Sequence, residues 1–288
     1  MAIFVDENNK VLVQGATGHQ GVFHISEMLA FGTKVVAGVT PGKAGQDVKG
    51  VPIFNTVLEG VKKTGADTSL ILVPARFAKD AVFEALEAGI KTIVTITENI
   101  PFHDAMEFVH YSKYKEAVLI GPNCPGIASP GKTKIGILPG GIFLEGNVGV
   151  ASRSGTLTYE IVNSLKEKDI GQSTCVGLGG DPIIGTTFID SLIAFEKDKN
   201  TKAIVLVGEI GGTAEEEAAE FIKENISKPV FAFIAGRTAP PGKRMGHAGA
   251  IIARGKGTAK SKIEAFKKAD VKLAKFPTDI ADLIEEII

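Results

Sequence analysis

The chain has 288 residues, of which 44% are hydrophobic and 23% are charged, and its formal net charge is -1. This length accommodates one large domain or two ordinary ones. The near-zero charge excludes a bulk electrostatic attraction to nucleic acid or to membrane surfaces. Two cysteines, Cys124 and Cys175, are too few for a disulfide framework or a metal cluster, so we expect no metal site. The N-terminus lacks a basic region followed by an apolar segment, and we therefore expect a cytoplasmic protein.

The first predicted unit is a strand, a glycine-rich turn and a helix. A β-branched run within residues 3–13 predicts a buried strand, and a helical pattern extends from Val22 to about Phe31. Between them, glycines 15, 18 and 21 recur at every third position. A turn of this kind between a strand and a helix is the context of a phosphate-binding site. Its glycine spacing differs from that of the dinucleotide fingerprint, so the turn alone does not identify the ligand.

The end of the second strand, predicted over Thr33–Val39, gives information about the nucleotide. An NAD-binding unit places an acid there to bind the ribose hydroxyl. This sequence has Thr40-Pro41-Gly42-Lys43 instead. A lysine at that position favours an additional phosphate, as in NADP or at the 3′ position of CoA. A solvated turn lysine without a ligand is an equally good interpretation of Lys43 from these residues alone.

Strands and helices continue to alternate through the first half. The predicted strands are Ser69–Val73, Thr92–Ile96 and Ala117–Ile120, and the predicted helices are Arg76–Ala88 and Pro101–Tyr114. This alternation predicts an α/β fold with a parallel, doubly wound sheet, whose ligands bind at the carboxyl ends of the strands. Ile96, Thr97 and Glu98 lie at such an end and are candidate nucleotide contacts. The alternative for Glu98 is a position beside a helix N-cap with no ligand.

Glycine and proline become frequent from Gly121 to Gly149, and we place a domain boundary there. The predicted division is a first domain at 1–122, a Gly/Pro-rich linker at 123–147 and a second domain at 148–288. A formal Walker A match spans Gly126–Thr133, but no helix can follow it, so we reject it as a P-loop. Cys124 has no neighbouring base that would activate it, and we interpret it as a small buried thiol near a ligand.

The second half repeats the same alternation. The predicted strands are Val148–Ala151, Thr174–Leu178, Ala203–Val207, Val230–Ala235 and Val271–Lys275. The first predicted helix is opened by Ser152–Thr156 and runs to about Lys168. The others are Thr186–Lys197, Thr213–Asn225, Thr258–Ala269 and Asp279–Ile288. Two strand ends carry candidate site residues, and the first of them is suited to an anion. Ser154, Gly155 and Thr156 open a helix with hydroxyls and free N–H groups, and Glu209 follows another strand.

His247 lies in a loop, Gly236–Gly257, that contains six glycines. Lys243 and Arg244 precede it and suit an anionic partner. Histidine can form covalent intermediates with phosphoryl groups. An acid beside it, here Glu209, fixes the tautomer and stabilises the charged form. We therefore interpret these groups as a phosphohistidine site. A surface histidine on a flexible turn is the alternative that an isolated loop would favour.

The whole chain resembles the α subunits of succinyl-CoA synthetase, or succinate–CoA ligase. The motifs that carry the resemblance are Thr17–Gly21, Gly38–Lys43, Gly121–Gly126, Ser152–Glu160, Gly208–Gly212 and Gly242–Ala250. The resemblance implies a Rossmann-like CoA-binding domain followed by a flavodoxin-like ligase domain. It also implies a tricarboxylic acid cycle reaction in which succinyl-CoA, phosphate and a nucleoside diphosphate give succinate, CoA and the triphosphate.

The resemblance also assigns roles to residues. It implies that His247 carries the phosphoryl group, that Glu209 holds the histidine, and that Tyr159 contacts the substrate. The implied CoA contacts are Thr17, Gly18, His19, Gln20, Lys43, Ile96, Thr97 and Glu98. A nucleotide site with Mg²⁺ is expected on a partner β subunit, in an αβ or α2β2 assembly, and the chain alone is expected to be inactive.

Other functions remain open from the sequence. Malate–CoA ligase and ADP-forming acetyl-CoA synthetase share these motifs. An NADP-dependent oxidoreductase would use the same first domain, but it leaves the His247 loop without a role. A CoA-sensing repressor would need a basic DNA-reading face, which the net charge does not favour.

Overall fold

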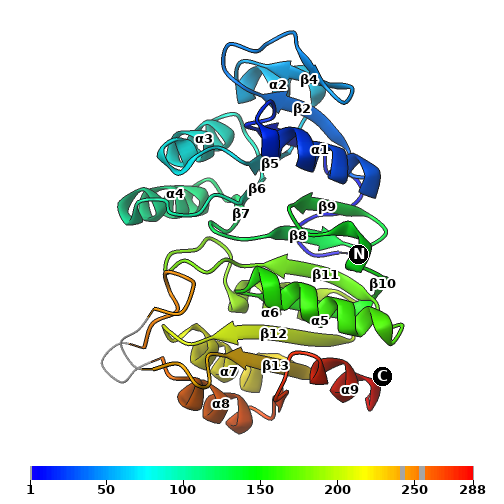
Figure 1. The fold of residues 1–288 in the computed structure, drawn as a ribbon, viewed down its shortest axis with the longest axis vertical. Coiled ribbons are helices and arrows are strands. Elements are labelled where there is room, and N and C mark those ends of the chain that lie inside the picture. Colours follow the sequence, from blue (N-terminus) through cyan, green and yellow to red (C-terminus); the bar gives the residue numbers. More distant parts are fainter. Residues whose placement is uncertain (1, 241–243, 253–256, 288) are drawn as a thin grey trace.

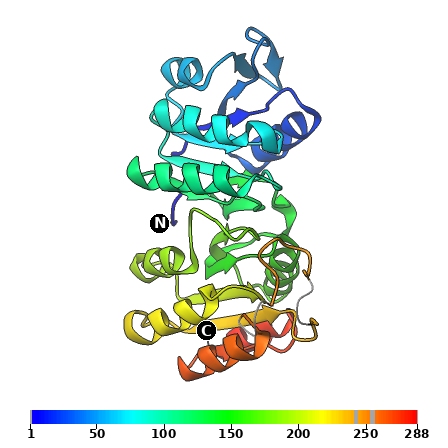
Figure 2. The same ribbon diagram turned by 90° about the vertical axis from the view of Figure 1, so that its left-hand side faces the viewer.

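A computed structural model of the chain describes residues 2–240, 244–252 and 257–287. These residues form two seven-stranded sheets, which lie one above the other in Figure 1. Figure 2 shows helices on both sides of each sheet. No helix in the described part of the chain has both the length and the apolar character that a membrane span needs.

The N-terminal sheet has the strand order β3-β4-β2-β1-β5-β6-β7, and only the β3–β4 pair is antiparallel. Its strands are β1 (Val11–Gln14), β2 (Val35–Val39), β3 (Asp47–Val48), β4 (Val51–Phe54), β5 (Thr68–Ile71), β6 (Thr92–Thr95) and β7 (Val118–Ile120). Its helices are α1 (His19–Phe31), α2 (Val57–Thr64), α3 (Ala75–Glu87) and α4 (Phe102–Tyr114). The chain continues from β1 to β2 on one side, and β5 pairs with β1 on the other. The carboxyl end of β1 is therefore a topological switch point, where α/β sheets bind ligands.

The C-terminal sheet has the order β14-β13-β12-β10-β11-β8-β9, with β8 and β9 antiparallel to their neighbours. Its strands are β8 (Gly126–Ser129), β9 (Thr133–Gly136), β10 (Glu145–Ser152), β11 (Gln172–Gly177), β12 (Ala203–Glu209), β13 (Val230–Ala235) and β14 (Lys272–Leu273). Its helices are α5 (Gly155–Glu167), α6 (Phe188–Lys197), α7 (Ala214–Asn225), α8 (Ala259–Lys268) and α9 (Asp279–Glu285). Strand β10 lies between β11 and β12, so the switch point of this sheet is at the ends of β10 and β12.

The segment expected to be a linker, 123–147, instead belongs largely to the second sheet. It contains the hairpin β8–β9, the short helix η1 (Gly140–Ile142) and the start of β10. The hairpin also confirms that the Walker A match is not a P-loop, because strand β9 rather than a helix follows Lys132. The glycines that suggested a loop allow two backbones to approach closely. A Cβ on Gly126 would lie 2.1 Å from the carbonyl oxygen of Ile135.

One hydrophobic core joins the two halves. Buried residues of the first half, such as Ile25 and Met28 on α1, share a cluster with Ile127 and Ile135 of the hairpin. Polar contacts cross the same boundary, because the Thr33 hydroxyl donates to the carbonyl oxygen of Lys134 at 2.8 Å. These contacts fix the two sheets relative to each other, and no free linker separates the two halves in the described part of the chain.

Most predicted elements are present, with boundaries shifted by a few residues. Helix α1 begins at His19 rather than Val22, because Gly18 is its N-cap. Residues His19 and Gln20 therefore lie in the first helical turn. The prediction named no elements in 44–68, where the structure has β3, β4 and α2.

Candidate functional site

A cavity of about 680 Å³ lies between the two halves and brings most predicted site residues together. The first half contributes Gln20, Ile96, Thr97 and Glu98 to its lining. The second half contributes Gly155, Thr156, Tyr159 and His247. Residues from four separate predicted motifs thus meet at one place, where the carboxyl ends of strands from both sheets face each other.

His247 and Glu209 form the most distinctive pair in this cavity. Glu209 is the last residue of β12, and its Oε2 lies 2.8 Å from Nδ1 of His247. The Glu209 side chain is 8% exposed and the His247 side chain 28% exposed. A carboxylate only accepts hydrogen bonds, so Nδ1 is the donor and carries the proton. In the neutral ring this leaves Nε2 with its lone pair free.

The surroundings of His247 raise the pKa of its imidazole above the ordinary histidine value. The hydrogen bond to Glu209 is the largest cause, and Asp181 adds to it. Partial burial and the positive charge of Arg153 act in the opposite direction. The site therefore stabilises a positive charge on this ring, which is what a phosphorylated imidazole requires.

The ring of His247 packs against Gly180, in the turn after β11. A Cβ built on Gly180 would lie 2.3 Å from Cγ of His247, so no larger residue fits. The carbonyl oxygen of Gly180 also accepts a hydrogen bond from the N–H of Gly249, at 3.1 Å. The sequence analysis assigned no site role to Gly180; its position after a strand was the available signal.

The start of helix α5 has the predicted anion-binding character, but its three residues differ in placement. The Ser154 hydroxyl is the N-cap and accepts from the N–H of Leu157 at 3.4 Å. Ser154 is not among the residues that line the cavity, whereas Gly155 and Thr156 are. Their N–H groups have no carbonyl partner within the helix and lie at the positive end of its dipole.

The glycine turn after β1 forms a second concave surface, which adjoins the first. A cavity of about 810 Å³ is lined by Thr17, Gly18, His19 and Gln20, together with Val39 and Pro41. Gly21 is required by the close approach of helix and turn, because a Cβ there would lie 2.2 Å from the carbonyl oxygen of Gly15. Gln20 lines both cavities, which places the turn cavity next to the one that contains His247.

Lys43, Thr97 and Lys243 differ from the other candidates. Lys43 is exposed and lies outside the residues that line either cavity. The Thr97 hydroxyl already donates to the carbonyl oxygen of Val73 at 2.7 Å, and the Thr97 carbonyl oxygen accepts from the N–H of Asn123 at 3.0 Å, so a ligand would meet the lone pairs of the hydroxyl. Lys243, predicted as a cation beside His247, lies outside the described residues, while Arg244 lines a neighbouring cavity with His247.

Two side chains at the site keep their protons at neutral pH. Burial raises the pKa of the Cys124 thiol to about 12, and Cys124 donates to the carbonyl oxygen of Thr95 at 3.4 Å. Burial is also the largest cause of the raised pKa of Tyr159. Cys124 is therefore unsuited to act as a nucleophile, and Tyr159 is a neutral hydrogen-bond donor.

The sequence analysis also missed two polar residues that line the cavity, Asn123 and His24. Asn123, directly after the first half, donates through Nδ2 to Oδ1 of Asp181 at 2.8 Å. His24 lines the cavity, and its Nδ1 is buried without a hydrogen bond to any described residue. Asn123 and Asp181 are 58 positions apart, so no local pattern identifies their contact.

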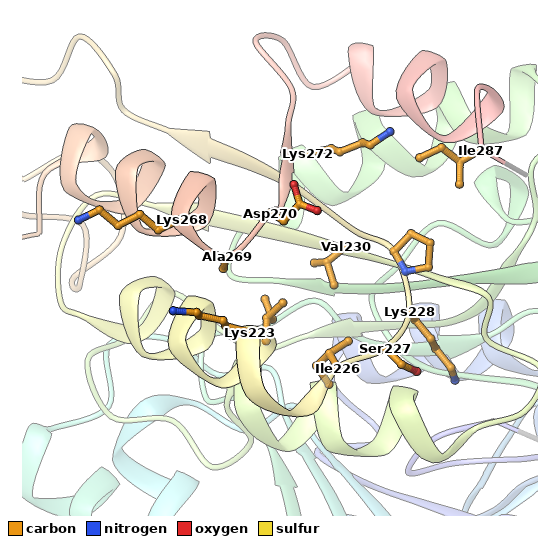
Figure 3. A pocket seen from close by; sticks show the side chains of 12 residues that line it. Lys223, Ile226, Ser227, Lys228, Val230, Lys268, Ala269, Asp270, Lys272 and Ile287 are labelled. Carbon is orange, nitrogen blue, oxygen red and sulfur yellow. The ribbon is translucent and has the colours of Figure 1, made fainter.

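Four lysine side chains line another cavity in the second half, but they are not arranged as a binding site. A cavity of about 500 Å³ at the amino ends of β13 and β14 is lined by Lys223, Lys228, Lys268 and Lys272 (Figure 3). Their side chains point in different directions rather than toward one ligand position. Within residues 2–240, 244–252 and 257–287, no group of three or more His, Cys, Asp or Glu side chains is placed to hold a metal ion.

Comparison with known proteins identifies the family. The family model described as CoA binding domain matches residues 6–99, and the one described as CoA-ligase matches residues 151–272. Subunit alpha 2 of the succinate–CoA ligase (ADP-forming) of Archaeoglobus fulgidus is 60% identical over 288 residues, which covers 100% of both chains. The chain belongs to the family of succinate–CoA ligase alpha subunits.

A second relative supports this assignment, and a solved structure of another enzyme shares the fold. The alpha subunit of the succinate–CoA ligase (ADP-forming) of Aquifex aeolicus is 56% identical over 290 residues, covering 100% of this chain and 95% of that one. The ATP citrate lyase of Methanothrix soehngenii, solved with citrate and coenzyme A, matches with a TM-score of 0.91 and 25% identity. That match covers 99% of this chain and 50% of the lyase. The expected fold, a CoA-binding domain followed by a CoA-ligase domain, is thereby confirmed.

Proposed function

We propose that this chain is the α subunit of a cytoplasmic succinate–CoA ligase and that His247 is its phosphoryl carrier. The reversible reaction converts succinyl-CoA, phosphate and a nucleoside diphosphate to succinate, CoA and the triphosphate. The observation that carries the proposal is the pair Glu209–His247 at the end of a cavity shared by both halves. One nitrogen of the ring is held by a buried carboxylate, and the other is available to react.

The chemistry needs three bond exchanges, and each balances. A phosphate oxygen attacks the thioester carbonyl carbon of succinyl-CoA, and the C–S bond breaks with its electron pair leaving on sulfur. Nε2 of His247 then attacks the phosphorus of the acyl phosphate, and the electron pair of the P–O bond leaves with succinate. Finally an oxygen of the nucleoside diphosphate attacks the phosphohistidine, and the electron pair of the N–P bond returns to Nε2.

The residues of this chain have separate tasks in that sequence. Glu209 holds Nδ1 and balances the positive charge of the phosphorylated ring. Gly155 and Thr156 line the same cavity, and their N–H groups, in the first turn of α5, suit the phosphoryl oxygens. Tyr159 lines the cavity with its hydroxyl protonated, which supports a role as hydrogen-bond donor to the acyl or phosphate oxygen of the substrate.

The first half, residues 1–122, binds CoA in this proposal. Its nucleotide lies along the turn Thr17–Gln20, and its thiol end passes Ile96, Thr97 and Glu98 toward His247. Lys43 lies near the nucleotide phosphate. The nucleoside diphosphate and its Mg²⁺ bind to a β subunit, which completes the enzyme as an αβ or α2β2 assembly.

The test is turnover by the assembled enzyme. The chain is produced with its partner β subunit and supplied with succinyl-CoA, phosphate and ADP or GDP, while CoA thiol and nucleoside triphosphate are measured together. We expect equal amounts of both products from the assembly and none from this chain alone. A panel of succinate, malate and acetate in the reverse direction identifies the acid. Turnover by the single chain, or thiol release without triphosphate, would contradict the proposal.

A further inference from the structure

Beyond Glu209, a line of charged side chains continues into the interior of the second half. Arg153, Glu215 and Lys262 follow Glu209 in this line, and we name the four residues the buried ionic chain. Glu209 is 6% exposed, Arg153 7%, and Glu215 and Lys262 0%. Burying charge is costly unless opposite charges and hydrogen bonds compensate it. Such a chain therefore fixes its members in position.

Arg153 is the link between the two carboxylates. Its Nη1 donates to Oε1 of Glu215 at 3.1 Å and to the carbonyl oxygen of Gly211 at 3.3 Å. Its Nη2 lies 3.4 Å from Oε1 of Glu209. That distance makes an ion pair, but the geometry is not that of a hydrogen bond, and Oε1 of Glu209 has none among the described residues. The two oxygens of Glu209 are thus divided between Arg153 and His247.

Glu215 and Lys262 hold Arg153 from the far side. Lys262, on α8, donates to Oε2 of Glu215, to Oε2 of Glu216 at 2.9 Å and to the carbonyl oxygen of Gly212 at 3.1 Å. Oε1 of Glu215 also accepts from the backbone N–H of Glu209 at 3.1 Å. Glu215 therefore positions Glu209 twice, directly through its backbone and indirectly through Arg153.

We propose that Arg153 is a positioning residue for His247, held in place by the pair Glu215–Lys262. It fixes the Glu209 carboxylate so that Oε2 faces Nδ1, which keeps the proton on Nδ1 and leaves Nε2 unprotonated. The proposal rests on the proposed function, in which Nε2 takes up the phosphoryl group. If the buried ionic chain only stabilised the interior, it would not need to include Glu209, the carboxylate that contacts His247.

The test compares Arg153→Met and Arg153→Lys with the wild type. Lysine keeps the charge, so this variant is expected to fold, but its compact ammonium group lacks the planar fork whose two separate nitrogens contact Glu215 and Glu209 in the wild type. Lys168→Met is the matched control, because Lys168 also pairs with two carboxylates, those of Asp282 and Glu285, far from the cavity. Nitrogen-15 NMR of the full chain, with His247→Asn to assign the signal, reports which ring nitrogen carries the proton. Phosphorylation is measured on the assembled enzyme.

At a pH above the pKa of His247, where the ring is neutral, we expect a single Nδ1–H tautomer in the wild type and in Lys168→Met. Both Arg153 variants should show a mixed tautomer and slower phosphorylation, by roughly 10- to 100-fold for methionine and less for lysine, with unchanged CoA affinity. Lys262→Met should cause a smaller change in the same direction.

Folded Arg153 variants with the wild-type tautomer and rate would overturn the proposal. If Arg153→Met does not fold, the lysine variant decides by the same two measurements. A wild-type enzyme that never carries phosphate on His247 would refute the proposed function instead, and the tautomer comparison would still test Arg153.

Discussion

Both halves of the chain have a seven-stranded, mainly parallel sheet with a turn and a helix at its switch point. After β1 this turn contains glycines, and the approach of backbones is so close that Gly21 leaves no room for a Cβ. After β10 the turn contains hydroxyls, and the Ser152 hydroxyl accepts from the N–H of Ser154 at 3.2 Å. The turn after β1 therefore presents backbone groups to a ligand, whereas the turn after β10 lies next to titratable side chains.

The difference shows how one topology serves two tasks. Strand ends of the first half offer small residues and N–H groups, which suit binding of a nucleotide. Strand ends of the second half bring Glu209 and Arg153 to His247, which suits covalent chemistry. Changes in the second half should therefore abolish phosphoryl transfer and spare CoA binding, and changes in the first half should do the reverse.

The largest separation is expected from His247→Asn. Asparagine has a similar polar shape but no nucleophilic ring nitrogen, so turnover of the assembled enzyme should fall below detection. CoA affinity, measured by calorimetry, should equal that of the wild type. His110→Asn, on the exposed face of α4, is the control and should keep full activity. A loss of CoA binding in His247→Asn would remove the distinction between the halves.

A smaller effect is expected from Gly180→Ala. The added methyl group would overlap the imidazole of His247, with only 2.3 Å to Cγ, and displace the ring from Glu209. A displacement of about 1 Å is expected to slow phosphorylation roughly 100-fold. Gly141→Ala is the control, since a Cβ there meets nothing within 4 Å. Single-turnover phosphorylation of both variants measures the effect, and equal rates would show that the ring does not react from this position.

Glu209→Gln tests the comparison through the pH dependence of the phosphorylation rate. Phosphorylation requires unprotonated Nε2, so its rate should rise with pH through a midpoint above the ordinary histidine pKa, because Glu209 raises the pKa of His247. In the variant the hydrogen bond to the Glu209 carboxylate, which raises the pKa of His247 most, is absent. Asp181 raises this pKa only weakly, and Arg153 still lowers it. The midpoint should therefore move to lower pH, and the plateau rate should fall about tenfold. An unmoved midpoint in the phosphorylation profile would contradict this role of Glu209.

The parallel sheets were largely predictable from the sequence, and the segment between them was not. Buried strands such as β12 and β13 are continuous apolar runs bounded by turn residues, which is a strong local signal. In the hairpin β8–β9, Gly126 and Gly136 have φ of 102° and 123°. The glycine content of this segment indicated a loop. Here, however, the glycines are required because the two strands are in close backbone contact.

The site was predictable where strand ends determine it. Glu209 and His247 were expected together because residues that follow neighbouring parallel strands share one edge of the sheet. The buried ionic chain gave no such signal, since Arg153 and Glu215 are 62 positions apart and Lys262 is a further 47 positions along. These charges meet because α7 packs against the residue that follows β10 and α8 packs against α7.

The smallest effect is expected from Lys43→Ala, in the first half. Lys43 is exposed, so its contact with a phosphate is screened by solvent and should contribute about 1 kcal/mol or less. CoA should bind a few-fold more weakly, which corresponds to that energy, and dephospho-CoA should bind equally to both proteins. Phosphorylation of His247 should not change. If both ligands bind wild type and variant alike, Lys43 does not contact the nucleotide phosphate.

The most direct test of the central claim is the chemical nature of the phosphate on the assembled wild-type enzyme. After incubation with labelled phosphate and succinyl-CoA, the protein is denatured, exposed separately to acid and to base, and its peptides are examined by mass spectrometry. Phosphohistidine predicts a label that survives base, is lost in acid and lies on the peptide that contains His247. A label that survives acid, or that lies on any other residue, would contradict the account.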